Sequence, residues 1–315
     1  MARTTVSLVA YQNRPEDLES LMHVLAEDPF IAAWVIVDNS ASEDPELSAQ
    51  LCATTLAHGG IYIPSPRNVG FGAGHNSAMR VLRNTPSDFH LMLNPDIGFD
   101  ASVLPALAEV MDARPEVGLV MPRVYFPNGV SQAHCHLLPT PVDLILRRFA
   151  PLFLKRIAQQ RMLHYDLRAM DKTQPAEVPF FSGCFLFMRR SLLDRIGGFD
   201  ERFLLYMEDV DLCRRLAAHA ELVYWPAVSI SHVHQRGSYK NVKLTRIHAH
   251  SALLYFSKWG WFVDRERTRI NDNARQRLLG VLPTAASLAL APSRPTSLAG
   301  ALAAAKSQRH PPSSQ

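Results

Sequence analysis

The sequence predicts an α/β fold whose first half forms a parallel sheet, and three observations lead to this prediction. The chain has 315 residues and is 47% hydrophobic, which is enough to bury a substantial core. Its first half alternates short apolar or β-branched runs with segments whose apolar residues recur at helical intervals. Several polar residues that could carry chemistry follow directly after predicted strands, where open α/β sheets place their ligand crevices.

The first half reads as β-α-β-α-β-α-β, which is half of a doubly wound sheet. The expected strands are Thr5–Ala10, Trp34–Val37, Ile61–Ile63 and His90–Leu93. The expected helices between them are Pro15–Leu25, Pro45–Leu56 and Ala73–Leu82.

The second half is less regular. We expect a helix at Val103–Met111, a strand near Val117–Met121, a less regular region from about 129 to 177 that resembles an insertion, and a strong strand at Phe180–Met188. A short helix at Ser191–Arg195 is closed by two glycines, and a further helix covers about Asp209–Ala218. The Ala-, Pro- and Ser-rich tail from about residue 278 is expected to be disordered at its end.

Composition excludes several classes of protein. The net charge of +4 arises from 33 basic and 29 acidic residues, a balance too even for a dedicated nucleic-acid binder. No apolar run reaches the roughly 18 residues of a spanning helix, and the N-terminal segment lacks the pattern of a signal peptide. The cysteines are scattered without CxxC pairs, which favours reduced thiols in the cytosol: Cys52, Cys135, Cys184 and Cys213.

Two segments of the first half could bind a nucleotide diphosphate. Asp38 ends a buried strand, where a carboxylate can accept hydrogen bonds from a base or ribose, although a helix cap or turn is the alternative. The stretch SPRNVGFGAGHNSAM places Arg67 and three glycines before a helix, which offers a guanidinium and close backbone approach. A plain glycine-rich turn would show the same pattern.

Candidate metal ligands follow two other strands. Asp96, in Asn94-Pro95-Asp96, offers an oxygen ligand that suits Mg²⁺ or Mn²⁺, and an Asx turn is the alternative. His232 and His234 end a later strand and precede Arg236 and Lys240, two cations suited to phosphate. The trio His134, Cys135 and His136 resembles a metal cluster but lacks a second pair of ligands, so we give it no function.

A cluster of acids lies among apolar residues in GGFDERFLLYMEDVDLCRRL. Its members are Asp200, Glu201, Glu208, Asp209 and Asp211. Apolar surroundings raise the pKa of a carboxyl group toward that of a general base. Asp211 also fits the simpler role of complementing the dipole at the start of a helix.

Five segments in this order carry a resemblance to a known family. They are VDNSAS, RNVGFGAGHN, NPDIGFD, FFSGCFLFMRRSLLDRIGGFDERFLLYMEDVDLCRRL and HVHQRGSYKN. Together they resemble glycosyltransferase family 2, and within it the rhamnosyltransferase-like enzymes that build lipid-linked bacterial surface polysaccharides. The resemblance covers about residues 5 to 260, and its long fourth segment is highly specific.

The resemblance implies a GT-A fold, a Rossmann-like mixed sheet flanked by helices, with a helical C-terminal region. Residues 1–265 would form the catalytic domain, divided into a nucleotide-sugar-binding half (1–125), a variable insertion (126–178) and an acceptor and catalytic half (179–265). Residues 266–315 would be a helical and then disordered tail.

The resemblance also implies residue roles. Asp209 would be the catalytic base of an inverting transfer, with Glu208 as its competitor. Asp96 and His232 would hold Mg²⁺ or Mn²⁺, with His234 as the fallback, although Asn94 replaces the first carboxylate of the family's DxD element. The donor site would comprise Asp38, Arg67, Asn68, Gly74, Asn94, Asp96, Gly183, Arg236 and Lys240.

The implied partners are a nucleotide-sugar donor, best dTDP-L-rhamnose, and a saccharide acceptor linked to polyprenyl diphosphate. Apolar and basic residues alternate around Pro151, in 144–149 and 152–156, which predicts peripheral attachment to the inner face of the plasma membrane. A cluster of Trp259, Trp261 and Phe262 could add an interfacial anchor or could pack on the catalytic domain.

Rival interpretations remain at this stage. A nucleotidyltransferase would share the sheet and the metal, but its first strand is usually followed by a glycine-rich basic loop, and Ala10-Tyr11-Gln12-Asn13 is neither. A relative that uses another dTDP- or UDP-sugar has the same motifs. A non-catalytic carbohydrate-binding protein would retain the fold without turnover.

Overall fold

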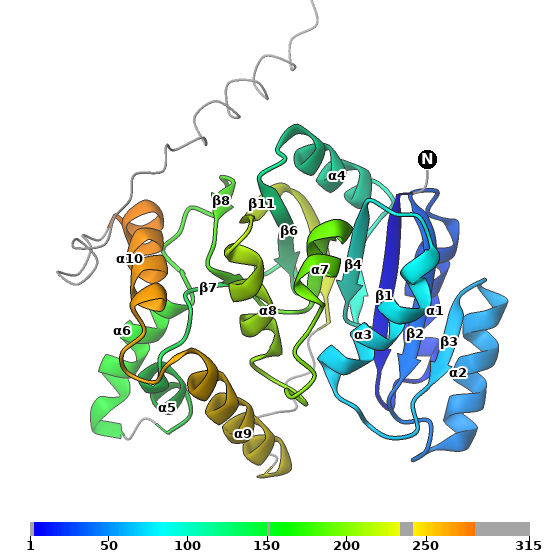
Figure 1. The fold of residues 1–315 in the computed structure, drawn as a ribbon, viewed down its shortest axis with the longest axis horizontal. Coiled ribbons are helices and arrows are strands. Elements are labelled where there is room, and N and C mark those ends of the chain that lie inside the picture. Colours follow the sequence, from blue (N-terminus) through cyan, green and yellow to red (C-terminus); the bar gives the residue numbers. More distant parts are fainter. Residues whose placement is uncertain (1–2, 150–151, 234–241, 281–315) are drawn as a thin grey trace, which may run out of the picture.

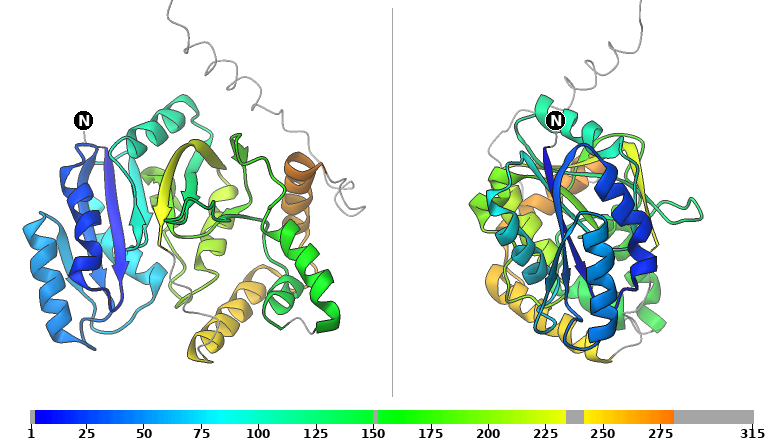
Figure 2. Two further views of the ribbon diagram at one scale, coloured as in Figure 1. Left: turned by 180° about the vertical axis from the view of Figure 1, so that it is seen from behind. Right: turned by 90° about the vertical axis from the view of Figure 1, so that its right-hand side faces the viewer.

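The computed structural model describes residues 3–149, 152–233 and 242–280 (Figure 1). A large mixed sheet has helices on both faces, and a group of further helices lies at one end of it (Figure 2). Its strands lie in the order β3-β2-β1-β4-β10-β6-β11-β5, and β8 pairs with β11. The predicted α/β class and the mixed sheet flanked by helices are therefore confirmed.

The N-terminal half contains the predicted alternation. Strands β1, β2, β3 and β4 are parallel, with β1 between β2 and β4. Proline occupies the first helical position of α1 and of α2, where its missing N–H costs nothing. The bounds are β1 (Thr4–Ala10), α1 (Pro15–Glu27), β2 (Ile31–Asp38), α2 (Pro45–Ala57), β3 (Ile61–Pro64), α3 (Phe71–Val81), the 3₁₀ turn η1 (Leu82–Asn84) and β4 (Phe89–Leu93).

The second half makes the sheet mixed. Strand β10 is antiparallel to both of its neighbours, β4 and β6, whereas β11 is parallel to β6. The bounds are β5 (Ile97–Gly98), α4 (Val103–Ala113), β6 (Val117–Tyr125), β10 (Phe185–Arg189), α7 (Arg190–Ile196), α8 (Glu208–Ala217) and β11 (Glu221–His232).

The single strand predicted over Phe180–Met188 is wrong. The run contains two strands, and β9 (Phe180–Phe181) pairs with β7 (Cys135–His136) in a separate two-stranded sheet. A turn at 182–184 then leads into β10. Because the run is apolar on both sides of the turn, periodicity cannot reveal that the chain changes its partner strand.

Residues 129–177 are more regular than predicted. They contain β7, α5 (Pro141–Phe149), η2 (Leu152–Leu154), α6 (Lys155–Tyr165) and β8 (Ala176–Glu177). Two C-terminal helices follow later, α9 (Val242–Trp259) and α10 (Arg265–Leu279). These helices gather with α5 and α6 at the end of the molecule away from β3, as Figures 1 and 2 show. The predicted helical C-terminal region is confirmed, while the tail 281–315 lies outside the described residues.

Two buried histidines lie at the centre of the N-terminal half. The hydroxyl oxygen of Ser7 on β1 lies 2.7 Å from Nδ1 of His75 and 2.9 Å from Nε2 of His90. Thr5 contacts the other nitrogen of His90 at 2.9 Å. Burial lowers the pKa of His75 to about 3 and lowers that of His90 well below its usual range. Both rings are therefore neutral in the folded protein at neutral pH.

Candidate active site

The candidate site lies at the carboxyl ends of the parallel strands, as predicted. Asp38 ends β2 and is buried, and its carboxylate accepts hydrogen bonds from the backbone and hydroxyl of Ser40 at 2.8 and 2.7 Å. The Tyr62 hydroxyl donates to its other oxygen at 2.7 Å. Asp38 therefore organises the start of the loop after β2, and its contact with a donor stays a prediction.

The loop 67–70 is held in place by a residue that sequence reasoning missed. The amide of Asn39 donates to the carbonyl of Gly70 at 3.0 Å and accepts from Val69 at 3.4 Å. Arg67 and Asn68 are exposed on this loop, where a ligand can reach them. The neighbouring motif VDNSAS contained Asn39, but nothing local indicated its partner.

Gly74 has a packing role in the structure. It lies inside α3, and a Cβ atom there would come within 2.7 Å of the Val9 side chain on β1. The absence of a side chain thus allows α3 to approach the sheet closely. Its predicted contact with the donor stays untested.

The structure brings Asp96 and His232 together. Nε2 of His232 lies 3.2 Å from Oδ1 of Asp96. Backbone pairing fixes this approach, because His232 on β11 is paired with Ile97 on β5, and the Val233 N–H donates to the Asp96 carbonyl at 3.0 Å. His232 is buried and Asp96 is partly exposed, so an imidazole nitrogen and a carboxylate oxygen share one point near the surface. The carboxylate oxygen suits Mn²⁺ or Mg²⁺, and the imidazole nitrogen offers a second ligand atom beside it.

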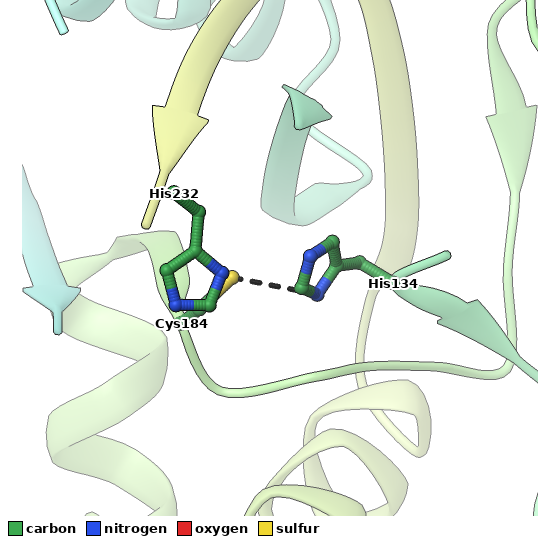
Figure 3. Close-up of side chains that lie close together, drawn as sticks. All are labelled: His134, Cys184 and His232. Atoms are coloured by element: carbon green, nitrogen blue, oxygen red, sulfur yellow. Dashed lines mark hydrogen bonds between the residues drawn. The ribbon is translucent and has the colours of Figure 1, made fainter. Parts of the chain in front are cut away.

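His134 also belongs to this neighbourhood, although the sequence led us to give it no function. One ligand atom from each of His134, Cys184 and His232 lies within 4.8 Å of the others (Figure 3). The Cys184 sulfur lies 3.5 Å from Nδ1 of His134. In the sequence, His134 is adjacent only to Cys135 and His136, so no metal partner was evident. In the structure, the partners of His134 come from β11 and from the 182–184 turn.

The 182–184 turn connects this cluster to the acids of α8. The Gly183 N–H donates to Oδ2 of Asp209 at 3.1 Å, and the Asn94 N–H donates to the carbonyl of Cys184 at 2.9 Å. Burial raises the pKa of the Cys184 thiol, and the negative charges of Asp96 and Asp209 raise it further.

Asp209 and Glu208 begin α8 in an apolar environment. Burial raises the pKa of Asp209, although the N–H groups of Val210 and Gly183 oppose the shift. Burial and the nearby charge of Asp209 raise the pKa of Glu208 well above its usual range. Oε2 of Glu208 is buried and has no hydrogen-bond partner.

The residues just before these acids have unusual backbone conformations. Tyr206 and Met207 both have positive φ angles, 69° and 68°. Left-handed conformations in residues other than glycine cost free energy and occur often at functional sites.

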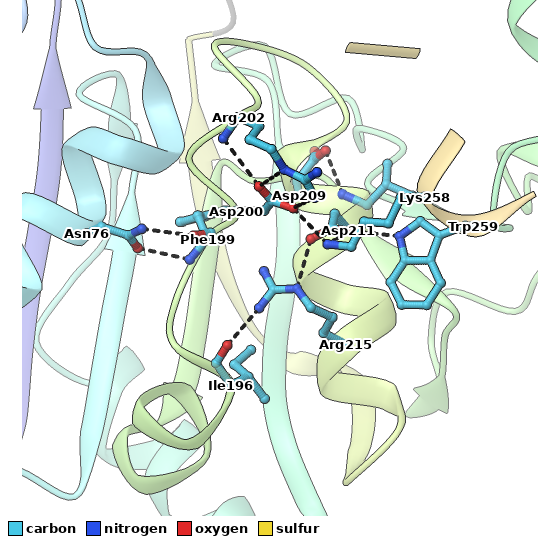
Figure 4. A network of polar contacts seen from close by, with 11 residues as sticks. Asn76, Ile196, Phe199, Asp200, Arg202, Asp209, Asp211, Arg215, Lys258 and Trp259 are labelled. Atoms are coloured by element: carbon cyan, nitrogen blue, oxygen red, sulfur yellow. Dashed lines mark hydrogen bonds and ion pairs between the residues drawn. The ribbon is translucent and has the colours of Figure 1, made fainter. Parts of the chain in front are cut away.

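Asp211 has a structural role, as the dipole argument suggested. Its buried carboxylate accepts from Trp259 and Lys258 at 2.8 Å each and from Arg215 at 2.8 Å (Figure 4). Lys258 also binds Asp200 at 2.8 Å. These contacts attach α8 to the end of α9, so the Trp259 side chain packs against α8, the alternative that the sequence also allowed.

Three predicted site residues lie outside the described residues. They are His234, Arg236 and Lys240. The contacts of the other predicted residues are those given above, and the family of the chain follows from a separate comparison. The model of glycosyl transferase family 2 matches residues 6–197. The chain belongs to this family.

The relatives of this family 2 chain include rhamnosyltransferases. It is 28% identical over 185 residues to an N-acetylglucosaminyl-diphospho-decaprenol L-rhamnosyltransferase of Mycobacterium tuberculosis, which covers 54% of this chain and 57% of that protein. It is 25% identical over 282 residues to the rhamnosyltransferase WbbL of Escherichia coli, covering 85% of this chain and 98% of the relative. The match thus spans little more than half of the mycobacterial protein.

Solved structures support the GT-A fold. Residues 1–349 of S. aureus TarS superpose with a TM-score of 0.51 at 16% identity, over 87% of this chain and 71% of that one. The same protein in complex with UDP also gives a TM-score of 0.51, at 14% identity over 92% and 75% of the two chains. Among the helices of the described residues, none is long and apolar enough to cross a membrane.

Proposed function

We propose that this chain is an inverting glycosyltransferase that moves a sugar from a nucleotide diphosphate to a hydroxyl of a lipid-linked saccharide. The observation that carries the proposal is the position of Asp209. Its carboxylate is oriented by the Gly183 N–H and has a raised pKa at the carboxyl edge of the sheet. A carboxylate with a raised pKa accepts a proton more readily at neutral pH.

In the proposed reaction Asp209 removes the proton of the acceptor hydroxyl. The hydroxyl oxygen forms a bond to the anomeric carbon while the bond from that carbon to the diphosphate oxygen breaks, and the electron pair leaves with the diphosphate. A single attack opposite the leaving group inverts the anomeric centre. The neighbouring Glu208 is buried and would keep its proton at a higher pH, so it is the weaker candidate for the base.

Asp96 and His232 are the proposed ligands of a divalent cation, Mg²⁺ or Mn²⁺. Their oxygen and nitrogen atoms are 3.2 Å apart, with Asp96 in the turn before β5 and His232 at the end of β11. The carboxylate suits either ion, and the imidazole would be the second protein ligand. When bound, the ion would offset negative charge on the leaving diphosphate. Asn94 supplies no second carboxylate; its backbone N–H instead holds the 182–184 turn.

The proposed donor is dTDP-L-rhamnose and the proposed acceptor is a saccharide on polyprenyl diphosphate. The named activities of the mycobacterial and Escherichia coli relatives support the sugar, and the name of the mycobacterial relative supports the acceptor class. The product would enter a bacterial surface polysaccharide, either an O-antigen or a cell-wall polymer. Asp38, Arg67, Asn68, Gly74 and the residues at 236 and 240 remain the proposed donor contacts.

The proposed location is the cytoplasmic face of the plasma membrane, with peripheral attachment through α5, η2 and α6. Phe153 is 82% exposed, and Ile145 and Ile157 are also exposed. Lys155 and Arg156 are exposed beside them. Apolar side chains interleaved with cations suit an anionic lipid surface. Phe262 and Val263 are exposed on the loop between α9 and α10 and could extend this surface.

The test is incubation of the protein with a panel of sugar nucleotides, a polyprenyl-diphosphate saccharide and Mg²⁺ or Mn²⁺. We expect consumption of dTDP-L-rhamnose with formation of the longer lipid-linked saccharide. Turnover of a UDP-hexose alone would reject the donor but leave the transferase function. No consumption of any donor would favour a non-catalytic carbohydrate-binding protein.

A further inference from the structure

Gln132 lies between the two histidine rings of the site. Its amide nitrogen is 2.7 Å from the carbonyl oxygen of His232 and 3.4 Å from that of Tyr125. Its amide oxygen is 2.8 Å from Nε2 of His134 and 3.1 Å from Nδ1 of His232. All the hydrogen-bonding positions of this one side chain are thus used.

These contacts determine which way the amide points. Carbonyl oxygens only accept hydrogen bonds, so the NH₂ group of Gln132 must face the carbonyls of His232 and Tyr125. The opposite orientation would place an amide oxygen 2.7 Å from a carbonyl oxygen. The amide oxygen therefore faces both rings, and each ring nitrogen that contacts it must carry a proton.

The proton positions have a consequence on the far side of each ring. A neutral imidazole has one N–H, so Nε2 of His232 and Nδ1 of His134 carry lone pairs. Nε2 of His232 faces the carboxylate of Asp96 at 3.2 Å. With the ring neutral, this lone pair and the carboxylate oxygen point to one place, where a divalent cation could bind both. Nδ1 of His134 can instead accept from the Cys184 thiol, at 3.5 Å.

We propose that Gln132 is a positioning residue for the metal ligand His232. Its amide oxygen holds the ring with the proton on Nδ1 and so presents Nε2, together with Asp96, to a divalent cation. The proposal rests on the metal site of the proposed function. It also gives the insertion 126–178 a part in that site, because Gln132 and its second ring contact, His134, both come from it.

The cluster of His134, Cys184 and His232 therefore helps to hold the metal ligand His232 in place. Its ligand atoms are close enough to surround an ion. The Gln132 oxygen binds one nitrogen of each ring, so each ring has only its other nitrogen left for an ion. Hydrogen bonds to the far nitrogen of a ligating histidine orient the ring and raise its basicity.

The first measurement is ¹⁵N NMR of the full chain labelled in histidine and free of metal, about two pH units above the ordinary imidazole pKa. We expect His232 in the Nδ1–H form and His134 in the Nε2–H form. The His232 signals are identified by their loss in His232→Gln. Free imidazole side chains in water prefer the Nε2–H form, so an Nε2–H form of His232 in the wild type would overturn the proposal.

The second measurement is the Kd for Mn²⁺ in variants of Gln132. Gln132→Met removes the acceptor at similar size; we expect loss of the Nδ1–H form and about a 10- to 100-fold weaker Kd. Gln132→Glu keeps an acceptor for both rings, so we expect the Nδ1–H form to persist and the Kd to stay closer to the wild type. Gln174→Met is the matched control, because it makes the same change at an exposed glutamine outside the site, and it should leave both readouts unchanged.

Equal weakening by Gln132→Met and Gln132→Glu, with the Nδ1–H form kept in both, would show a general packing role and overturn the proposal. An unchanged Kd in Gln132→Met would also overturn it. Failure of the metal site itself is distinguished by Asp96→Ala. If Asp96→Ala binds Mn²⁺ as the wild type does, the proposed metal site fails. If Asp96→Ala weakens Mn²⁺ binding but the Gln132 variants leave the Kd unchanged, the metal site stands and Gln132 is not its positioning residue.

Discussion

Gly183 and Asp209 are joined by a hydrogen bond of 3.1 Å from the Gly183 backbone N–H to Oδ2 of the carboxylate. A side chain at position 183 would contact both Asp209 and Phe71 at 3.4 Å. The turn that follows β9 thus orients the acid at the start of α8 and leaves room beside it. Because the donor is the backbone N–H of Gly183, the hydrogen bond is kept in any variant whose side chain at position 209 retains an oxygen in the same place.

The sharpest prediction concerns Asp209→Asn. The amide keeps the size of the side chain and can still accept from Gly183, but it cannot take up a proton at neutral pH. We expect sugar transfer to fall by about 10²- to 10⁴-fold while donor affinity changes little. Transfer and donor binding are measured together, with Asp211→Asn as a control that should lower stability more than turnover. Retention of more than about a tenth of the transfer would pass the role of base to Glu208.

Asp96→Ala tests whether metal and donor share one site. Removal of the carboxylate leaves His232 as a lone nitrogen ligand, so we expect a weaker response to Mg²⁺ or Mn²⁺ and a loss of transfer. Asp100→Asn, which alters a nearby exposed carboxylate that bonds Ser102, should leave both unchanged. An unaltered metal optimum in Asp96→Ala would remove this residue from the site.

Glu208→Gln should stabilise the protein at alkaline pH. The pKa of Glu208 is raised in the folded state, so the native protein binds the proton more tightly than the unfolded chain does. The free-energy cost of ionising the buried Glu208 carboxyl is therefore absent below the ordinary carboxyl pKa, and it grows as pH rises toward the pKa of the folded state. We expect the free energy of unfolding of Glu208→Gln to exceed that of the wild type more at pH 8 than at pH 5. A difference independent of pH would contradict the assigned shift.

His75 and His90 should make the protein sensitive to acid. Their pKa values are lowered in the folded state, so stability is complete above the unfolded value of about 6.5 and is lost as pH falls below it. Each ring can cost up to about 1.4 kcal/mol per pH unit in that range. Urea unfolding at several pH values between 8 and 5 measures how steeply the free energy of unfolding falls with pH. His75→Gln should reduce this slope. His23→Gln, at an exposed position on α1, should leave it unchanged.

Replacement of Phe153 and Ile157 by serine tests the proposed lipid contact. Burial of a large apolar side chain contributes about 1.5–3 kcal/mol, so loss of both should weaken sedimentation on anionic vesicles at low salt by more than tenfold. Leu56→Ser, at an exposed leucine on α2, is the matched control. Wild-type protein that stays entirely in solution with such vesicles would falsify the membrane contact itself.

Much of the fold and part of the site could be predicted from local patterns. The β-α alternation of the first half was evident because each element has its own periodicity and its own proline or glycine boundary. The same patterns placed Asp38, Asp96 and His232 at strand ends, and ends of neighbouring strands meet at one edge. The pairing of Asp96 with His232 was implied only by the family resemblance. In the structure β10 and β6 separate β4 from β11, and the pairing of the short strand β5 with β11 brings the two residues together.

Other features depended on contacts between distant segments. The break at 182–184 lies within an apolar run, and only its two partner strands reveal it. The dipole argument set Asp211 apart from Asp209, but their partners come from distant segments: Trp259, Lys258 and Arg215 bind Asp211, whereas Gly183 binds Asp209.

By itself, then, the sequence determined the α/β class, the family and the strand-end acids, because these depend on periodicity and on motifs within short segments. Only the tertiary structure decided that Gln132 and His134 of the insertion meet His232. That meeting depends on hydrogen bonds between residues 100 positions apart, Gln132 and His232, and no local pattern encodes such a bond.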